Sequence, residues 1–403
     1  MKHYTGDPQF DFQIIRFTSR LKHHPEVMAD LSEVGQAITD FESWYTWWTS
    51  KASDYEAQGK LDIAARYFRA AAFYLDTTDP RKKSTLDHYT ALFYQTYQGS
   101  PYSYHKIPYP GGYLPALRIE CPGASRTLLV LGGFDGMLEE LCDFVAPLQN
   151  QGYHLILFDG PGQGQTYQQG LTFQPNFEVP VKVVLDYFGL KSCDAMGLSW
   201  GGYLVMRAAA FEPRIQSVIC LDIFYSAMDA LKLTLGPVAY SGFRLLYHLR
   251  AKPLINGLTE YFTKSNIQLK WSLQNGYQLT GEKTPYDFYR NLERHQVAPI
   301  LNRISQPCLL LAGQEDQYVP AYRLKQIKRK LIHAKAIESQ LFTSQTGGAL
   351  HCQMDRLDLV YPLVLDFLQK YNFQIQTLNK KEAYRPLFLM LLTKNVLIEH
   401  GLT

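Results

Sequence analysis

The sequence predicts an α/β protein with a mostly parallel central sheet. Apolar runs of buried-strand type recur at residues 127–131, 154–158, 192–196, 217–221 and 308–312. Segments of helix length separate most of these runs, which is typical of parallel strands joined by crossover helices. The chain has 403 residues, more than most single hydrophobic cores support, so we expect a large core with smaller regions attached to it.

Helical patterns dominate the residues before about 100. Phe41, Trp44 and Trp48 recur on one helix face, and the preceding Thr39-x-x-Glu42 pattern predicts a capping box with a helix start near Thr39. Residues 57–71 resemble one unit of a helical repeat. Because a solenoid needs at least three such units and no second copy is visible, we predict a helical hairpin instead.

Two further changes of pattern divide the rest of the chain. Residues 102–119 read as a β-hairpin split by the turn Pro110-Gly111-Gly112, and residues 225–300 replace strand-like runs with helical spacing. Five regions follow in chain order: a helical N-terminal region over 1–100, a first core part over 101–224, a helical cap insertion over 225–300, a second core part over 301–372, and a tail, predicted to be helical, over 373–403. The apolar run at 387–392 in that tail is too short to cross a membrane.

Composition excludes several function classes. Lys and Arg total 40 against 37 Asp and Glu, with the signs interleaved, which argues against a nucleic acid partner. The first residues lack an apolar signal core and no apolar run is long enough to span a bilayer, so we predict a soluble, cytoplasmic protein without a membrane span. The six cysteines lack the spacing of a zinc or redox site, so no metal and no cofactor are predicted.

A serine motif follows one of the predicted strands. The apolar run 193–196 leads into Gly197-Leu198-Ser199-Trp200-Gly201, and a helical stretch begins near Tyr203. This order of strand, sharp turn and helix is that of the nucleophile elbow. The two glycines of the motif remove Cβ atoms where strand and helix approach each other. Ser199 is therefore the predicted nucleophile, and a glycine-rich turn with an exposed serine is the alternative.

A serine alcohol needs a base, and the base needs an orienting acid. Asp316 lies just past the strand 308–312 and is the predicted acid. Its neighbour Glu315 is a rival, and so is Asp222, just beyond the strand that ends at Leu221. Each of these carboxylates also fits a solvated loop position.

The base is expected after the acid in the chain, since the order in this class of site is serine, acid, histidine. His351 follows a predicted strand at 339–343 and the glycine-containing segment 346–350, so a loop position is expected to let its ring reach the serine. His333, at the basic end of a predicted surface helix, and His400, in the tail, are the rivals. A capping or core histidine is the structural alternative for His351.

Two backbone N–H groups are expected to hold the oxyanion, one from the residue after the nucleophile and one from the loop after an earlier strand. Trp200 supplies the first, and Phe134 in Gly132-Gly133-Phe134-Asp135-Gly136 supplies the second. The acids Asp135, Glu139 and Glu140 also fit favourable positions at a helix start.

One segment imitates a dinucleotide-binding fingerprint. The strand over 154–158 runs into Gly160-Pro161-Gly162-Gln163-Gly164-Gln165. Gln165 stands where the third glycine is required, so the fingerprint fails and a tight loop is predicted.

Taken together, these segments resemble α/β-hydrolases with a helical N-terminal region and cap, including dihydroxypseudooxynicotine hydrolase, the fermentation-respiration switch protein and fungal polyketide-shortening hydrolases. Besides the serine elbow, the segments that carry the resemblance are 44–48, 132–140, 158–164, 211–214 and 351–352. The resemblance implies the α/β-hydrolase fold, the triad of Ser199, Asp316 and His351, and a lid formed by the N-terminal helices and the insertion. The segment 346–350 departs from relatives, which carry a more polar, acidic approach to the histidine.

The expected function is that of a serine hydrolase acting on the carbonyl of a small-molecule ester, amide or ketone, as an esterase or acyl-peptidase-like enzyme. Some members of the family that the chain resembles hydrolyse a carbon–carbon bond beside a carbonyl, so a hydrolase of β-diketone or polyketide-like substrates is the alternative. A binding protein on a hydrolase scaffold is the alternative from another class. The cap helices and the apolar tail are candidate contacts for a homodimer.

Overall fold

The computed structural model describes residues 3–98 and 101–371. The chain divides into two compact units, Met1–Leu357 and Asp358–Thr403. The second unit contains a helix over residues 360–371, and the predicted helical tail over 373–403, with its apolar run, lies outside the described residues. The five regions expected from the sequence stay predictions.

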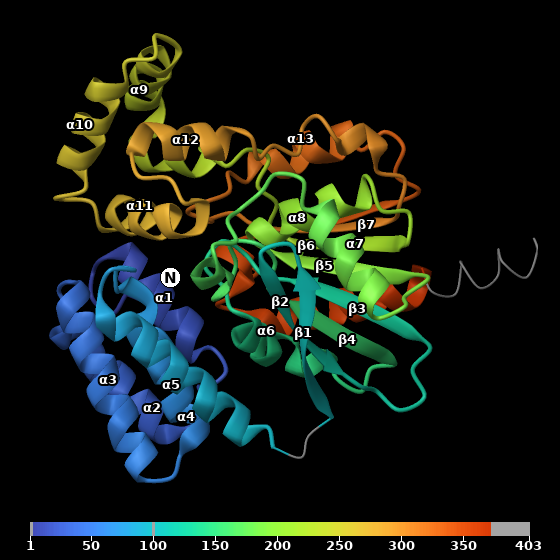
Figure 1. Ribbon diagram of the computed structural model, residues 1–403, viewed down its shortest axis with the longest axis horizontal. Coiled ribbons are helices and arrows are strands. Elements are labelled where there is room, and N and C mark those ends of the chain that lie inside the picture. The colour runs from blue at the N-terminus through green and yellow to red at the C-terminus, as the bar shows by residue number, and fades with distance from the viewer. Residues whose placement is uncertain (1–2, 99–100, 372–403) are drawn as a thin grey trace, which may run out of the picture. The chain divides into compact units, whose positions relative to one another are not determined.

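An eight-stranded sheet forms the centre of the first unit (Figure 1). The strand order is β1-β2-β4-β3-β5-β6-β7-β8, with antiparallel pairing of β1 with β2 and of β2 with β4 and parallel pairing in the rest. The strands are β1 Tyr102–Tyr109, β2 Gly112–Ile119, β3 Arg126–Leu131, β4 Tyr153–Phe158, β5 Cys193–Leu198, β6 Ile215–Leu221, β7 Cys308–Gly313 and β8 Ile337–Phe342. The prediction of a mostly parallel sheet is confirmed.

The connections between parallel strands are mostly helical, as the spacing of the apolar runs predicts. The helices are α6 Leu138–Val145, α7 Glu178–Tyr187, α8 Trp200–Ala209 and α13 Tyr322–Lys330, with short 3-10 helices at Ala146–Leu148, Thr166–Gln169, Leu301–Arg303 and His351–Gln353. α8 packs against β5 and β6, so the residue between β5 and α8 stands at the carboxyl edge of the sheet.

Five helices precede the sheet: α1 Pro8–Thr18, α2 Pro25–Ala37, α3 Phe41–Ala57, α4 Leu61–Ala71 and α5 Pro80–Thr96. Aromatic side chains hold them together, because the Trp44 ring is fully buried, stacks on Phe10 of α1 at 5.4 Å and donates its Nε1–H to the Ala70 carbonyl of α4 at 2.7 Å. α3 and α4 pack against each other as the predicted hairpin.

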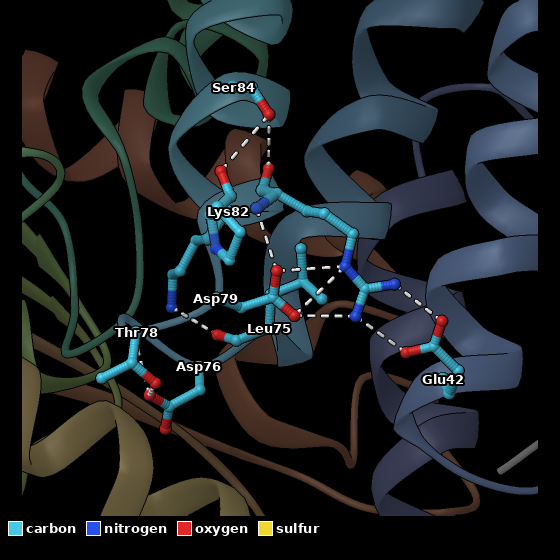
Figure 2. A network of polar contacts seen from close by, with 9 residues as sticks. Glu42, Leu75, Asp76, Thr78, Asp79, Lys82 and Ser84 are labelled. Atoms are coloured by element: carbon cyan, nitrogen blue, oxygen red, sulfur yellow. Dashed lines mark hydrogen bonds and ion pairs between the residues drawn. The ribbon is translucent and has the colours of Figure 1, made fainter.

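The predicted capping box is wrong by one residue. The N-cap of α3 is Asp40, whose carboxylate accepts from the Ser43 N–H at 2.8 Å while the Ser43 hydroxyl accepts from the Asp40 N–H at 2.9 Å. Glu42 cannot close a box with Thr39 because its carboxylate binds the Arg81 guanidinium at 2.6 and 2.8 Å (Figure 2). A short Asp–Ser pair thus takes the capping positions and leaves the glutamate for a contact with α5.

The insertion between β6 and β7 is helical throughout most of its length, as predicted. It contains α9 Met228–His248, α10 Lys252–Phe262, α11 Ile267–Thr280 and α12 Pro285–Glu293. α9 bends at Gly236-Pro237, where Gly236 has φ 74°. α11 lies beside the N-terminal helices in Figure 1, and Trp271 of α11 stacks on Phe73 at 5.3 Å. Among the described residues, no helix has both the length and the apolar character needed to cross a membrane.

Candidate active site

The turn at Ser199 has the backbone strain expected of a nucleophile elbow. Ser199 joins β5 to α8 with φ 59° and ψ −122°, a conformation that non-glycine residues rarely adopt. A Cβ atom at Gly197 would lie 2.0 Å from the Gly201 carbonyl oxygen, and one at Gly201 would lie 2.4 Å from the Leu131 carbonyl oxygen. Only glycine fits at both positions, so the sharp turn depends on them.

The structure brings Ser199, His351 and Asp316 into one hydrogen-bonded chain. His351 Nε2 lies 2.7 Å from Ser199 Oγ, and His351 Nδ1 lies 2.6 Å from Asp316 Oδ2. A carboxylate at Nδ1 assigns the proton to that nitrogen, which leaves Nε2 free to accept from the serine hydroxyl. The Ser199 side chain is partly exposed, whereas the other two side chains are buried.

Asp316 is held in position by the backbone that follows it. Its Oδ1 accepts from the N–H groups of Tyr318 and Val319 at 2.7 and 2.9 Å, and its Oδ2 faces His351. Glu315, the adjacent rival, is exposed. The loop after β7 therefore turns one carboxylate into the site and the other into solvent.

Asp222, the other rival acid, is also close to the histidine. It is buried at the end of β6 with φ 61°, and its Oδ2 lies 3.6 Å from His351 Nδ1. That carboxyl accepts instead from the Cys352 N–H at 2.5 Å and from the Gly313 N–H at 3.3 Å. Burial and then the charge of Asp316 raise the pKa of Asp222. Asp222 thus anchors the backbone beside His351, while Asp316 contacts the ring.

The segment before His351 is fixed by contacts rather than free to swing. Asp355 accepts from the N–H groups of Gly348 and Leu350 at 3.0 and 3.4 Å. A Cβ atom at Gly313 would lie 2.3 Å from the Ala349 carbonyl oxygen, so the segment packs directly on the end of β7. The rival base His333 lies exposed after α13, and His400 lies outside the described residues.

The electrostatics around His351 favour its charged form. Burial alone would lower the pKa of His351, but the charge of Asp316 and the hydrogen bond to it outweigh burial and raise that pKa well above its ordinary value. An imidazolium that forms when the ring takes a proton from a serine would be stabilised in this position.

Three aromatic rings surround the histidine. Tyr318 contacts the His351 ring edge to face at 4.9 Å, and Phe12 of α1 and Phe224 lie 6.1 and 6.2 Å from it. The Tyr318 hydroxyl donates to Gln9 Oε1 of α1 at 2.7 Å. The first helix of the chain therefore braces the loop that carries the acid.

The glycine-rich loop after β3 lies directly against the serine. A Cβ atom at Gly133 would lie 3.0 Å from Ser199 Cβ and 3.2 Å from Ser199 Oγ, so a larger residue at this position would crowd the serine. The next residue, Phe134, is the predicted oxyanion donor, and Trp200, the other one, begins α8, where the first backbone N–H groups have no intrahelical acceptor. Phe134 and Trp200 therefore both line the cavity that contains Ser199.

The segment that imitates a dinucleotide fingerprint supports this loop. Gln163 is buried, and its Nε2 donates to the carbonyls of Gly132 and Gly133 at 2.8 and 3.1 Å. Its Oε1 accepts from the Gly160 N–H at 3.0 Å. Gln163 thus fixes the direction of the peptide groups just before Phe134.

A cavity of about 150 Å³ lies beside Ser199 and His351. Its walls come from α1, from the loops at the carboxyl edge of the sheet and from α9, α11 and α12. Most of these side chains are apolar, and they include Phe12, Phe134, Trp200, Phe224, Trp271 and Phe288. The site is therefore an apolar chamber with the serine and histidine in its wall.

Two of the acids after β3 pair with arginines of the N-terminal helices. Arg16 contacts Asp135 at 2.9 Å and Glu140 at 2.5 Å, and Arg69 contacts Glu140 at 3.2 Å. Glu139 instead accepts from the Tyr94 hydroxyl at 2.9 Å. A favourable position at a helix start therefore does not by itself explain Asp135 and Glu140. Their ion pairs join the N-terminal helices to the core.

One group of side chains near the serine has metal-ligand types. Donor atoms of Asp222, His351 and Cys352 lie within 4.8 Å of one another. Both ring nitrogens of His351 are engaged, and burial raises the pKa of the Cys352 thiol to about 11. A neutral thiol and an occupied imidazole are poor metal ligands, so these three residues belong to the hydrogen-bonded site.

Local sequence gave no signal for several of these supporting residues. Gln9, Arg16, Gln163 and Tyr318 act across long separations in the chain, whereas Asp355 holds backbone groups five and seven residues before it. Only Gln163 lay in a segment that the sequence singled out.

Comparison with known proteins agrees with this fold. Residues 126–252 match the family model described as alpha/beta hydrolase fold. 20-hydroxy-prefusarin hydrolase FUS2 of Gibberella moniliformis is 28% identical over 386 residues, covering 84% of this chain and 91% of that protein. Hydrolase LUC6 of Fusarium sp is 28% identical over 372 residues, covering 82% of this chain and 88% of that protein.

Solved structures share the architecture at low identity. AbyA5 has a TM-score of 0.63 at 18% identity, covering 84% of this chain and 89% of that chain. 2,6-Dihydroxy-pseudo-oxynicotine hydrolase has a TM-score of 0.57 at 19% identity, covering 86% of this chain and 91% of that chain. The matched segment, the sheet and the hydrolase relatives together show that the chain has the α/β-hydrolase fold and is an enzyme similar to these hydrolases.

Proposed function

We propose that the chain is a serine hydrolase that cleaves a small organic carbonyl compound through Ser199, His351 and Asp316. The observation that carries the proposal is the hydrogen-bonded chain of Asp316 to His351 at 2.6 Å and His351 to Ser199 at 2.7 Å. Nucleophile, base and orienting acid in this geometry are what acyl transfer by a serine requires.

The proposed reaction has two halves. His351 Nε2 takes the proton of Ser199 Oγ as that oxygen forms a bond to the substrate carbonyl carbon, and the oxyanion accepts from the N–H groups of Phe134 and Trp200. The imidazolium then protonates the leaving alcohol or amine as its bond to carbon breaks. Water, deprotonated by the same histidine, releases the acid and restores the serine.

The cavity supports an apolar small-molecule substrate. Its lining is mostly aromatic and aliphatic, with some polar side chains such as Gln13, Gln268 and Ser272, so binding would depend largely on removing apolar surface from water. Two relatives bear the names of small organic substrates, 20-hydroxy-prefusarin and 2,6-dihydroxy-pseudo-oxynicotine. We propose an ester or amide as the substrate type, with carbon–carbon cleavage beside a ketone as the second candidate.

Product analysis separates these activities. The purified chain would be incubated with apolar esters, N-acyl peptides and β-diketones, and the products identified by mass spectrometry. We expect a carboxylic acid with an alcohol or amine from the first two classes. Turnover of β-diketones alone would replace the ester or amide proposal with the carbon–carbon one.

A fluorophosphonate probe tests the nucleophile independently of substrate choice. The probe bonds covalently to an activated serine, so wild type should label and Ser199→Ala should not. A wild-type chain that stays unlabelled would favour the remaining alternative, a binding protein on a hydrolase scaffold.

Gln163 is expected to affect the reaction rate by positioning loop 132–136, which carries the predicted oxyanion donor Phe134. Replacing it with leucine removes the hydrogen bonds to the Gly132 and Gly133 carbonyls, so the Phe134 N–H would lose its fixed direction. We expect kcat to fall by about 10²-fold, the range for loss of one oxyanion donor. KM should change little, and steady-state kinetics measure both.

Gln168→Leu is the matched control, because Gln168 lies in the same segment but is exposed, and its side chain hydrogen-bonds to Gln165 rather than to the Gly132 and Gly133 carbonyls. Its kcat should stay at the wild-type level. An equal fall in both variants, or a change confined to KM in Gln163→Leu, would contradict the positioning role of Gln163.

A further inference from the structure

A second, smaller cavity lies on the other side of the loop that carries Phe134. It measures about 30 Å³ and is lined by side chains of α4, α5 and α11 together with the loop from Phe134 to Met137. Those four loop residues also line the larger cavity beside Ser199. The loop thus separates two chambers, and only the larger one contains the serine and histidine.

The small cavity contains a buried ammonium group without a counter-ion. Lys82 of α5 is 7% exposed, and its Nζ donates to the Leu75 carbonyl and to Gln278 Oε1, both at 2.8 Å. Figure 2 shows the lysine directed to that carbonyl, while Asp76 turns to Thr78. Among the described residues, no carboxylate lies within ion-pair distance of Lys82, and two neutral acceptors leave one of its three N–H groups unused.

Two further residues that line the same cavity have buried donors without acceptors among the described residues. Arg69 is 5% exposed, and its Nε has no partner among the described residues, although the guanidinium also binds Glu140. Nδ2 of Asn275, on α11, is buried and has none either. Buried donors that remain unpaired destabilise a fold, so three unused donors around one cavity indicate an acceptor-rich occupant.

The charge of Lys82 is not balanced by an ion pair among the described residues. The carboxylates of Asp135 and Glu140 pair with Arg16 and Arg69, and Asp76 acts on Lys82 through its charge from beyond ion-pair distance. Burial, and then the charge of Arg69, lowers the pKa of Lys82 to about 8. The charged form of Lys82 is therefore less favoured than in water, and a bound anion would stabilise it.

We propose that this cavity binds a small oxyanion of the carboxylate type, held by Lys82, Arg69 and Asn275. A volume of about 30 Å³ exceeds the space that one water needs, and a carboxylate offers enough lone pairs for all three donors. The bound anion would join α5, α11 and the Phe134 loop from the side opposite the serine. The proposal does not depend on the catalytic role of Ser199.

Thermal unfolding of the full chain tests the proposal. Formate and acetate represent organic carboxylates, nitrate represents an inorganic oxyanion of similar size, and chloride at equal ionic strength is the salt control. At saturating formate we expect the midpoint temperature to rise by about 3 °C above the chloride control, because a ligand of the folded state stabilises it by mass action. A response to formate and acetate but not to nitrate would identify a carboxylate as the occupant, and a response to all three would widen the ligand to small oxyanions.

Lys82→Met keeps the apolar stem and removes the charge. It should still fold in chloride, because removal of a buried charge without an ion pair offsets the loss of its hydrogen bonds to Leu75 and Gln278, and it should lose the formate response. Lys83→Met is the matched control, since Lys83 is exposed on the same helix and pairs with Asp87; it should keep the response. Because carboxylates can also bind beside Ser199, dependence on Lys82 is what assigns the effect to the small cavity.

Asn275→Leu provides a second variant if Lys82→Met fails to fold. Asn275 lines the small cavity and not the one beside Ser199, and loss of its donor should weaken formate binding at least tenfold by calorimetry. Wild type without any response beyond chloride would mean that the cavity holds water only. An undiminished response in the cavity variants would place the anion elsewhere. Either result overturns the proposal.

Discussion

Ser199→Ala is expected to lower kcat by about 10⁴- to 10⁶-fold, the range for loss of the nucleophile in this type of site. The oxyanion donors and the cavity remain, so substrate binding should persist with KM changed by no more than a few fold. Steady-state kinetics on the substrate identified by product analysis measure both constants. The fold should tolerate the change, because alanine fills less space than serine at a turn that already has positive φ.

His351→Ala and the double variant provide the internal test. Residues that act as one unit give losses that do not add, so the double variant should be about as slow as either single variant. Losses that multiply would show that Ser199 and His351 act in separate steps. A Ser199→Ala variant with more than one-tenth of wild-type activity would overturn the proposed mechanism.

Asp316→Asn is expected to reduce kcat by about 10⁴-fold. The amide retains the shape of the carboxylate but removes the charge that stabilises the imidazolium. It also places an NH₂ or a carbonyl where His351 Nδ1 requires an anionic acceptor, which favours the wrong tautomer of the ring. Glu315→Gln is the matched control, because Glu315 is the exposed neighbour and should leave kcat unchanged.

The variant Asp222→Asn distinguishes the role of Asp222 from that of Asp316, the other acid near His351. An asparagine can still accept from the Cys352 N–H, and Asp222 lies 3.6 Å from His351 Nδ1 against 2.6 Å for Asp316. We therefore expect a loss of no more than about tenfold, since direct charge stabilisation falls with distance and the hydrogen bond from the Cys352 N–H is retained, although the longer one from the Gly313 N–H is lost. A larger loss in Asp222→Asn than in Asp316→Asn would make Asp222 the orienting acid.

The N-terminal helices show where a sequence pattern stops being informative. The aromatic spacing at Phe41, Trp44 and Trp48 correctly predicted a helix, because one turn of helix brings those residues to one face. The same pattern cannot show that α1 would place Gln9 against Tyr318 or Arg16 against Asp135. Those contacts join residues more than a hundred positions apart, and no local spacing encodes them.

The sequence by itself determined the sheet and the turn at Ser199. Apolar runs of strand length and the glycines at 197 and 201 act over a few residues, through burial and through the space that a Cβ atom needs. Only the tertiary structure decided which of Asp316, Glu315 and Asp222 contacts the histidine, which helices close the cavity, and that Lys82 is buried without a counter-ion. These properties depend on distances between elements that meet only when the chain packs, because hydrogen bonding and charge interactions are set by separation in space.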